Sequence, residues 1–170
     1  AAKQKFMRTV ARKGRQRLVS MTAAYAVSEK DGATVAELAR TFKARMVKNF
    51  CLTLLASLDE AEVHEMLKEQ YRSAQNATDR LSALSLYLSS SAEDRDEILA
   101  EEMRRAADAG PVAWENFLAA VAGSSSPDTV SYLRLVQRSG LFHVEQAGES
   151  RSLFLRFAQN RKLSRETEEG

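Results

Sequence analysis

One row of apolar residues constrains the fold more than any other feature of the sequence. Large apolar side chains recur every three to four positions over residues 35–58, at Val35, Leu38, Phe42, Met46, Phe50 (or Cys51), Leu54 and Leu58. This spacing matches the turn of an α-helix, and it predicts a helix with one apolar face over residues 35–57. Only 7 Gly and 2 Pro occur in the 170 residues, so few positions would interrupt a helix. We therefore expect long helices.

The same spacing recurs along the rest of the chain and divides it into short helical segments. The predicted helices are 3–28, 35–57, 60–72, 77–89, 92–108, 111–122, 127–138 and 150–160. Thr34 and Glu37 form a capping box, and Asp59 and Ser91 are predicted N-caps. Helices of this length with short links favour an all-α fold, either an irregular α-solenoid of stacked helical hairpins (HEAT or armadillo type) or an irregular bundle. We expect residues 1–170 to form a single helical domain.

A polar stretch interrupts the pattern at residues 73–78 and precedes the predicted helix 77–89. Asn76 is placed to cap this helix. Asp79 follows three residues later, where its carboxylate can accept hydrogen bonds from first-turn amides and complement the helix dipole. Arg80 points away from the first turn and can pair with another element. Asn76, Asp79 and Arg80 are therefore predicted structural residues.

Residues able to carry catalysis are sparse. His64 begins a zinc-like pattern, but the second His of His-Glu-x-x-His is replaced by Lys68, so no metal site and no catalytic residue are predicted. The lone Cys51 lies among apolar residues and reads as a core thiol. His143 and Trp114 are interpreted as packing residues.

The N-terminal segment carries a concentrated positive charge. Seven basic residues and no acidic ones occur in residues 1–17, namely Lys3, Lys5, Arg8, Arg12, Lys13, Arg15 and Arg17. Such a helix could contact RNA or an acidic protein surface, but without interleaved aromatic residues a solvated face is favoured and nucleic acid is an unlikely partner. No apolar run is long enough to span a membrane, so no membrane partner is expected.

Four stretches, in chain order, resemble sequences of one enzyme family. "RMVKNFCLTLLASL" (45–58) is similar to Arg-x-Leu-Lys-Asn-x-Cys-Leu-x-Tyr-Leu, and "YRSAQNATDRLSAL" (71–84) to Tyr-x-x-Ala-x-Asn-Met-Thr-Asp-Arg-x-x-Ala-Leu. "WENFLAAVAGSSSPDTVSYLRLV" (114–136) is similar to Trp-Phe-x-x-Gln-x-x-Ser-x-x-Pro-Asp-Thr, and "RSLFLRFAQN" (151–160) to Arg-Ser/Ala-Leu-x-x-x-Phe-Ala-x-Asn. These patterns belong to bacterial-type aminopeptidase N, a family of gluzincin zinc aminopeptidases. The resemblance covers about residues 45–160.

In that family these segments form the C-terminal helical domain, which closes over the catalytic domain and shapes the chamber through which peptides reach the zinc. The resemblance implies that this chain is such a domain, whole or truncated, of a cytoplasmic enzyme that removes N-terminal amino acids from peptides. The implied partners are the catalytic domain of the same polypeptide and peptide substrates. Zinc is expected in the full-length enzyme, whereas this chain alone is expected to hold no cofactor and to be inactive.

The resemblance also implies one functional residue. Arg151 matches a family arginine that faces the interior channel near bound peptide. The sequence departs from the family at Ala77, at Ala113 and at Gly148-Glu149-Ser150, where the family has Asn-Arg-x before that arginine. The competing hypothesis is a free-standing helical scaffold that binds a protein or RNA through its basic N-terminal helix. Binding of that kind should weaken steeply with salt.

Overall fold

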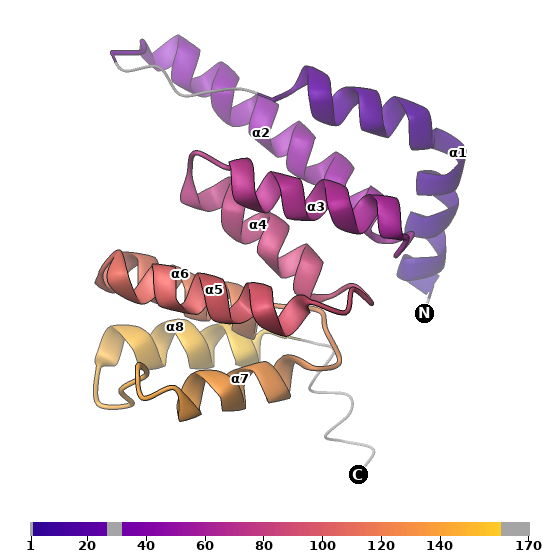
Figure 1. Cartoon of the computed structure of the whole chain (residues 1–170). Coiled ribbons are helices and arrows are strands. Elements are labelled where there is room, and N and C mark those ends of the chain that lie inside the picture. The colour runs from indigo at the N-terminus through magenta and orange to yellow at the C-terminus, as the bar shows by residue number, and fades with distance from the viewer. Residues whose placement is uncertain (1, 27–31, 161–170) are drawn as a thin grey trace. The chain divides into compact units, whose positions relative to one another are not determined.

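The structure, a computed structural model, describes residues 2–26 and 32–160. Within these ranges the chain forms eight α-helices and no β-strand (Figure 1). The helices are α1 (Ala2–Ala24), α2 (Val35–Ala56), α3 (Ala61–Ser73), α4 (Ala77–Leu88), α5 (Arg95–Asp108), α6 (Pro111–Ala122), α7 (Thr129–Arg138) and α8 (Ala147–Ala158). The prediction of an all-α fold is confirmed.

The chain divides into two compact units, Ala1–Ala83 and Leu84–Gly170, and the division falls within α4. In the first unit α2 packs against both α1 and α3. In the second unit α6 packs against α5, α7 and α8, and α5 also contacts α7. Each unit thus has one helix that contacts several others, and each has its own apolar core. The fully buried core residues include Leu55, Val63 and Leu67 in the first unit and Phe117, Leu118, Val121 and Val136 in the second.

Two helix starts follow the sequence signals closely. The Thr34 side chain accepts a hydrogen bond from the Glu37 N–H at 3.3 Å, and the Glu37 carboxylate accepts one from the Thr34 N–H at 2.8 Å. This is the complete capping box predicted for α2. Gly110 adopts φ +98°, a conformation that favours glycine, and Pro111 opens α6.

Two predicted N-caps are wrong. Glu60, and not Asp59, is the N-cap of α3, because the backbone turns through Asp59 with φ +55° before the helix begins. Ser91 does not cap α5, which begins three residues later than predicted, after Asp94. Ser90 instead accepts a hydrogen bond from the Ala92 N–H at 3.3 Å, so the chain turns once more before the helix starts.

Other boundaries shift by a few residues. The helix predicted over 3–28 ends at Ala24, and positions 27 and 28 of that prediction lie outside the described ranges. The predicted helix 127–138 begins at Thr129, and the predicted helix 150–160 runs from Ala147 to Ala158. Helix ends are set by local capping contacts rather than by apolar spacing, which explains why the ends differ while the helices agree.

Candidate functional site

A buried polar network joins α2 to the start of α4, within the first unit. Lys48 Nζ donates to Asp79 Oδ2 at 2.5 Å, and Asn49 Nδ2 donates to Asp79 Oδ1 at 3.1 Å. The Lys48 and Asp79 side chains are 6% and 3% exposed. Asn76 completes the network, because its Oδ1 accepts from the Asp79 N–H at 2.9 Å. Asn76 therefore caps α4.

The Asp79 carboxylate has different hydrogen-bond donors from those predicted. It accepts hydrogen bonds from the side chains of Lys48, Asn49 and Asn76 rather than from first-turn amides. Burial alone would raise the pKa of Asp79. The hydrogen bonds from Lys48 and Asn49, the charge of Lys48 and the contact with Asn76 outweigh burial, so the pKa of Asp79 lies below its ordinary value.

Arg80 binds the C-terminal end of the preceding helix, α3. Its Nη2 donates to the backbone carbonyl of Ala74 at 2.6 Å, and Ala74 is the C-cap of α3. The Arg80 guanidinium thus satisfies a carbonyl at a helix C-terminus, where positive charge is favourable. Asp79 and Arg80 together tie the turn between α3 and α4 to both neighbouring helices, α2 and α3.

Two of the stretches that carry the family resemblance, 114–136 and 151–160, also contact each other, within the second unit. Asn160 Nδ2 donates to the carbonyls of Ala122 and Ser124, at 3.0 and 2.6 Å. Ala122 ends α6, and Ser124 begins the loop toward α7. The Ser124 hydroxyl lies 3.2 Å from that of Ser89. The residues that carry the resemblance therefore contact one another in two pairs of stretches and hold helices together.

Trp114 is a core residue of the second unit. Its ring stacks on that of Phe117, with centroids 5.3 Å apart, and the residue is buried. It also lines a hollow of about 390 Å³ with Glu115, His143 and Glu149. Within the described residues the Trp114 Nε1 has no hydrogen-bond partner. The interpretation of Trp114 as a packing residue agrees with this environment.

Arg151 lies on the exposed side of α8 and makes no hydrogen bond or ion pair with the described residues. The neighbouring Glu149 points elsewhere, because its Oε2 accepts from the His143 N–H at 2.8 Å. Glu149 therefore does not neutralise Arg151 within the described part of the chain. The guanidinium remains available to a ligand or to another protein surface.

The histidines and the cysteine occupy separate places. His64 lies on α3, and its Nε2 is 2.8 Å from Oδ1 of Asp59 in the preceding turn. Cys51 is buried in the first unit, where burial raises the pKa of its thiol. Among residues 2–26 and 32–160, no three or more His, Cys, Asp or Glu side chains gather in a way that could hold a metal ion. The described helices also include none that is long and apolar enough to cross a membrane.

The most unusual surface of the first unit is an exposed apolar row along α2. It consists of Val35, Leu38, Phe42, Met46 and Phe50, whose exposed fractions range from 52% to 83%. The row extends from Val35 to Phe50, or over about 22 Å of helix. The core-facing side of α2 is formed by other residues, Cys51, Leu52, Leu54 and Leu55. Most of the apolar residues that predict the helix are therefore exposed, and the buried side of α2 overlaps with them only in part.

A groove continues the apolar row onto α1. It has a volume of about 600 Å³, and it is lined from α1 by Val10 and Met21 and from α2 by Met46 and Phe50. Exposed apolar patches of this kind mark interaction sites, because burying them in a partner removes apolar area from water. The row and the groove together form one candidate interface, which we call the α1–α2 face.

Comparison with protein families agrees with this architecture. Residues 1–169 match the family described as "Domain of unknown function (DUF3458_C) ARM repeats". The chain belongs to this family. ARM repeats are stacked helical repeats, so the match supports the α-solenoid of the two predicted architectures. No curated protein matches the chain.

Membership in an ARM-repeat family gives the α1–α2 face a clear physical meaning. Each repeat of such a protein buries its apolar side on its neighbour, and a repeat that ends the stack needs a polar outer side to stay soluble. The outer side of α2 is apolar instead. The α1–α2 face is therefore a candidate contact surface.

Proposed function

We propose that this ARM-repeat domain is the non-catalytic C-terminal domain of a cytoplasmic zinc aminopeptidase, which removes N-terminal amino acids from peptides. The domain docks on the catalytic domain of the same polypeptide and shapes the path of peptides to the zinc. The catalytic domain, and not this chain, holds the metal. The four resembling stretches support the proposal, because their best-matched residues make the contacts that fix the helices: Lys48, Asn49, Asn76, Asp79 and Asn160.

The observation that carries the proposal is the α1–α2 face. A row of five large apolar side chains, each more than half exposed, is unfavourable for a protein that works alone in water. Burying the part of each side chain that is now exposed would contribute roughly 1 kcal/mol per residue, hence on the order of 5 kcal/mol for the row. That is enough to hold a domain within the same polypeptide, where docking is intramolecular.

Arg151 is the residue we assign to the peptide path. Its guanidinium is exposed and has no partner in the described residues, so it can pair with a peptide carboxylate or carbonyl. In the full-length enzyme Arg151→Ala should raise KM for longer peptides and leave short substrates unchanged. Arg156→Ala is the matched control, because Arg156 is also exposed on α8 and points about 140° away. An unchanged KM for longer peptides in Arg151→Ala would remove this role.

The first test of the proposed function is the mass of the native polypeptide that contains residues 1–170. We expect a protein several times heavier than 18.9 kDa that contains zinc and hydrolyses aminoacyl substrates. A native protein near 18.9 kDa without peptidase activity would refute the proposal. The chain would then be better described as a free-standing scaffold, with α1 as its binding helix.

The second test separates docking from folding. Phe42→Ser and Val35→Ser remove side chains from the α1–α2 face, and Val112→Ser removes an equally exposed valine from α6. In the larger protein the first two variants should accelerate proteolysis between domains, whereas Val112→Ser should not. In the 170-residue chain all three should unfold at the same urea concentration as the parent. A large loss of stability in that chain would show that the row belongs to its own core.

A further inference from the structure

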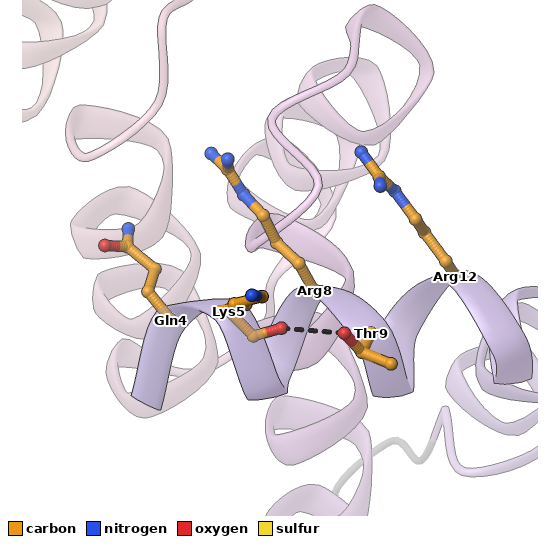
Figure 2. A pocket seen from close by; sticks show the side chains of 5 residues that line it. All are labelled: Gln4, Lys5, Arg8, Thr9 and Arg12. Atoms are coloured by element: carbon orange, nitrogen blue, oxygen red, sulfur yellow. Dashed lines mark hydrogen bonds between the residues drawn. The ribbon is translucent and has the colours of Figure 1, made fainter. Parts of the chain in front are cut away.

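Three cations of α1 line a hollow that lies outside the α1–α2 face and the buried Lys48–Asp79 network. The hollow has a volume of about 420 Å³ and is lined by Gln4, Lys5, Arg8, Thr9 and Arg12; we call it the basic hollow. Figure 2 shows the side chains of Arg8 and Arg12 leaving α1 in the same direction. Lys5, Arg8 and Arg12 occupy positions i, i+3 and i+7, which face one side of a helix. Their positive charges repel one another unless an anion lies among them.

The donors of this cluster are open, in contrast to those of a neighbour on the same helix. Arg15 donates to Glu60 at 2.5 Å and to Glu62 at 2.6 Å, so its charge is matched within the first unit. Within the described residues Lys5 and Arg12 have no side-chain hydrogen bond or ion pair. Arg8 uses only its Nε, which donates to the Ser57 carbonyl at 2.8 Å. That bond fixes the Arg8 side chain and leaves both Nη groups free.

The other polar side chains of the hollow limit the kind of ligand that it could bind. The Thr9 hydroxyl donates to the Lys5 carbonyl at 2.9 Å, so it offers no proton to a ligand (Figure 2). The donors that the hollow offers to a ligand are therefore mainly two guanidinium groups and one ammonium group. Guanidinium forks match the paired oxygens of phosphate groups, and such charge-assisted bonds are stronger than neutral ones.

The length of the cluster favours a chain of phosphates over a single one. The backbone positions of Lys5 and Arg12 are separated by about 10.5 Å along the helix axis, so a chain of phosphates lying along α1 can contact all three cations. No aromatic side chain lines the hollow. Proteins that bind single-stranded nucleic acids stack the bases on aromatic rings, so the lining argues against RNA.

We propose that the basic hollow is a binding site for a free polyphosphate chain, held by Arg8 and Arg12 and completed by Lys5. The site lies on α1 alone and does not depend on whether the chain belongs to an aminopeptidase. The base of a nucleoside triphosphate should add little, because no aromatic ring lines the hollow.

The test is a titration of the full 170-residue chain with inorganic tripolyphosphate. Binding is measured by calorimetry and by the change in the NMR signals of the arginine Nε–H groups. Arg12→Gln should weaken binding about tenfold, the loss of one bidentate charge-assisted contact. Lys13→Gln is the matched control, since it removes the same charge from the next residue, which faces another side of α1. It should change affinity by less than about twofold, as expected for long-range charge alone. Lys5→Gln gives a second variant within the cluster.

Three results would overturn the assignment. The first is no binding of tripolyphosphate at low salt. The second is equal weakening by Arg12→Gln and Lys13→Gln, which would indicate diffuse attraction and not a site. The third is tighter binding of single-stranded RNA than of tripolyphosphate with the same dependence on Arg12, which would assign the hollow to nucleic acid. Equal affinity for tripolyphosphate and ATP supports the proposal, because only the phosphates are then recognised.

Discussion

Replacing Asp79 by Asn should be among the most damaging single changes in the first unit. The substitution keeps the size of the side chain but leaves the ammonium group of Lys48 buried, 6% exposed, without its counter-charge. Removing one partner of a buried ion pair costs about 3–5 kcal/mol, since the remaining charge has lost both water and partner. Lys48→Met should cost a similar amount, because the Asp79 carboxylate then keeps only its contacts with Asn49 and Asn76.

The double variant Lys48→Met/Asp79→Asn, which combines the same two substitutions, isolates the pair. Both charges are gone, so the remaining cost is that of the weakened contacts with Asn49 and Asn76, about 1–3 kcal/mol. The sum of the two single costs should therefore exceed the cost of the double variant by about 3 kcal/mol or more, and this difference is the coupling energy of the pair. Arg15→Gln is the control, because its ion pairs with Glu60 and Glu62 are exposed and should contribute little.

Urea unfolding measures these costs with two signals. Far-UV circular dichroism reports all helices, whereas the fluorescence of Trp114, the single tryptophan, reports the second unit. The Asp79→Asn loss should appear first in the dichroism. Costs below about 1 kcal/mol for both single variants, or costs that simply add in the double variant, would refute the view that this pair fixes α4 on α2.

The same pair predicts a dependence of stability on pH. The pKa of Asp79 in the folded chain lies below its ordinary value of 3.8. The folded state therefore binds fewer protons than the unfolded state in the range between these two values, and stability falls as pH decreases through it. Above pH 3.8 the full contribution is present. Asp79→Asn should remove this part of the acid sensitivity, as measured by urea unfolding between pH 2 and pH 6 (about the range that brackets Asp79).

Three further substitutions test single contacts by urea unfolding. Thr34→Ala breaks the capping box of α2 and should cost about 1 kcal/mol, whereas Thr34→Ser should cost almost nothing. Asn160→Ala removes the Nδ2 donor from the Ala122 and Ser124 carbonyls, of which the Ser124 carbonyl keeps a hydrogen bond from the Thr129 hydroxyl at 3.3 Å. The change should cost about 1–3 kcal/mol, with Gln159→Ala as a neutral neighbour. Gly110→Ala forces a side chain into φ +98° and should cost about 1–3 kcal/mol although there is open space for the added carbon. A neutral result in any of the three would contradict the contact that it tests.

The local features of this fold were accessible from sequence. Apolar spacing places eight helices because the helical repeat is a property of neighbouring residues. The capping box at Thr34 was accessible for the same reason, since its two residues are three positions apart. The N-caps assigned to Asp59 and Ser91 failed because a cap depends on the path of the backbone into the helix. At Asp59 the backbone adopts a positive φ, which the residues of the turn do not predict.

The candidate sites depended on contacts between distant segments and were less accessible. Asp79 could be recognised as a polar residue at a helix start, but its partner Lys48 lies 31 residues earlier. One signal was available, because Lys48 shares a helix face with the buried residues Leu52 and Leu55. The exposure of the α2 row was not accessible at all. Apolar periodicity identifies a face that avoids water, but it does not tell whether the cover comes from the same unit or from a partner.

The two kinds of contact made by the resembling stretches should leave different traces in evolution. Lys48 and Asp79 meet through their side chains, so a relative that lost one and kept the other would carry an unmatched buried charge. Substitutions at positions 48 and 79 should therefore be inherited together. Asn160 meets the backbone carbonyls of Ala122 and Ser124, which any residue at those positions would supply. This contact constrains position 160 to asparagine but does not depend on the side chains at positions 122 and 124. An alignment should therefore show covariation between positions 48 and 79, and a constant asparagine at 160 that does not covary with 122 or 124.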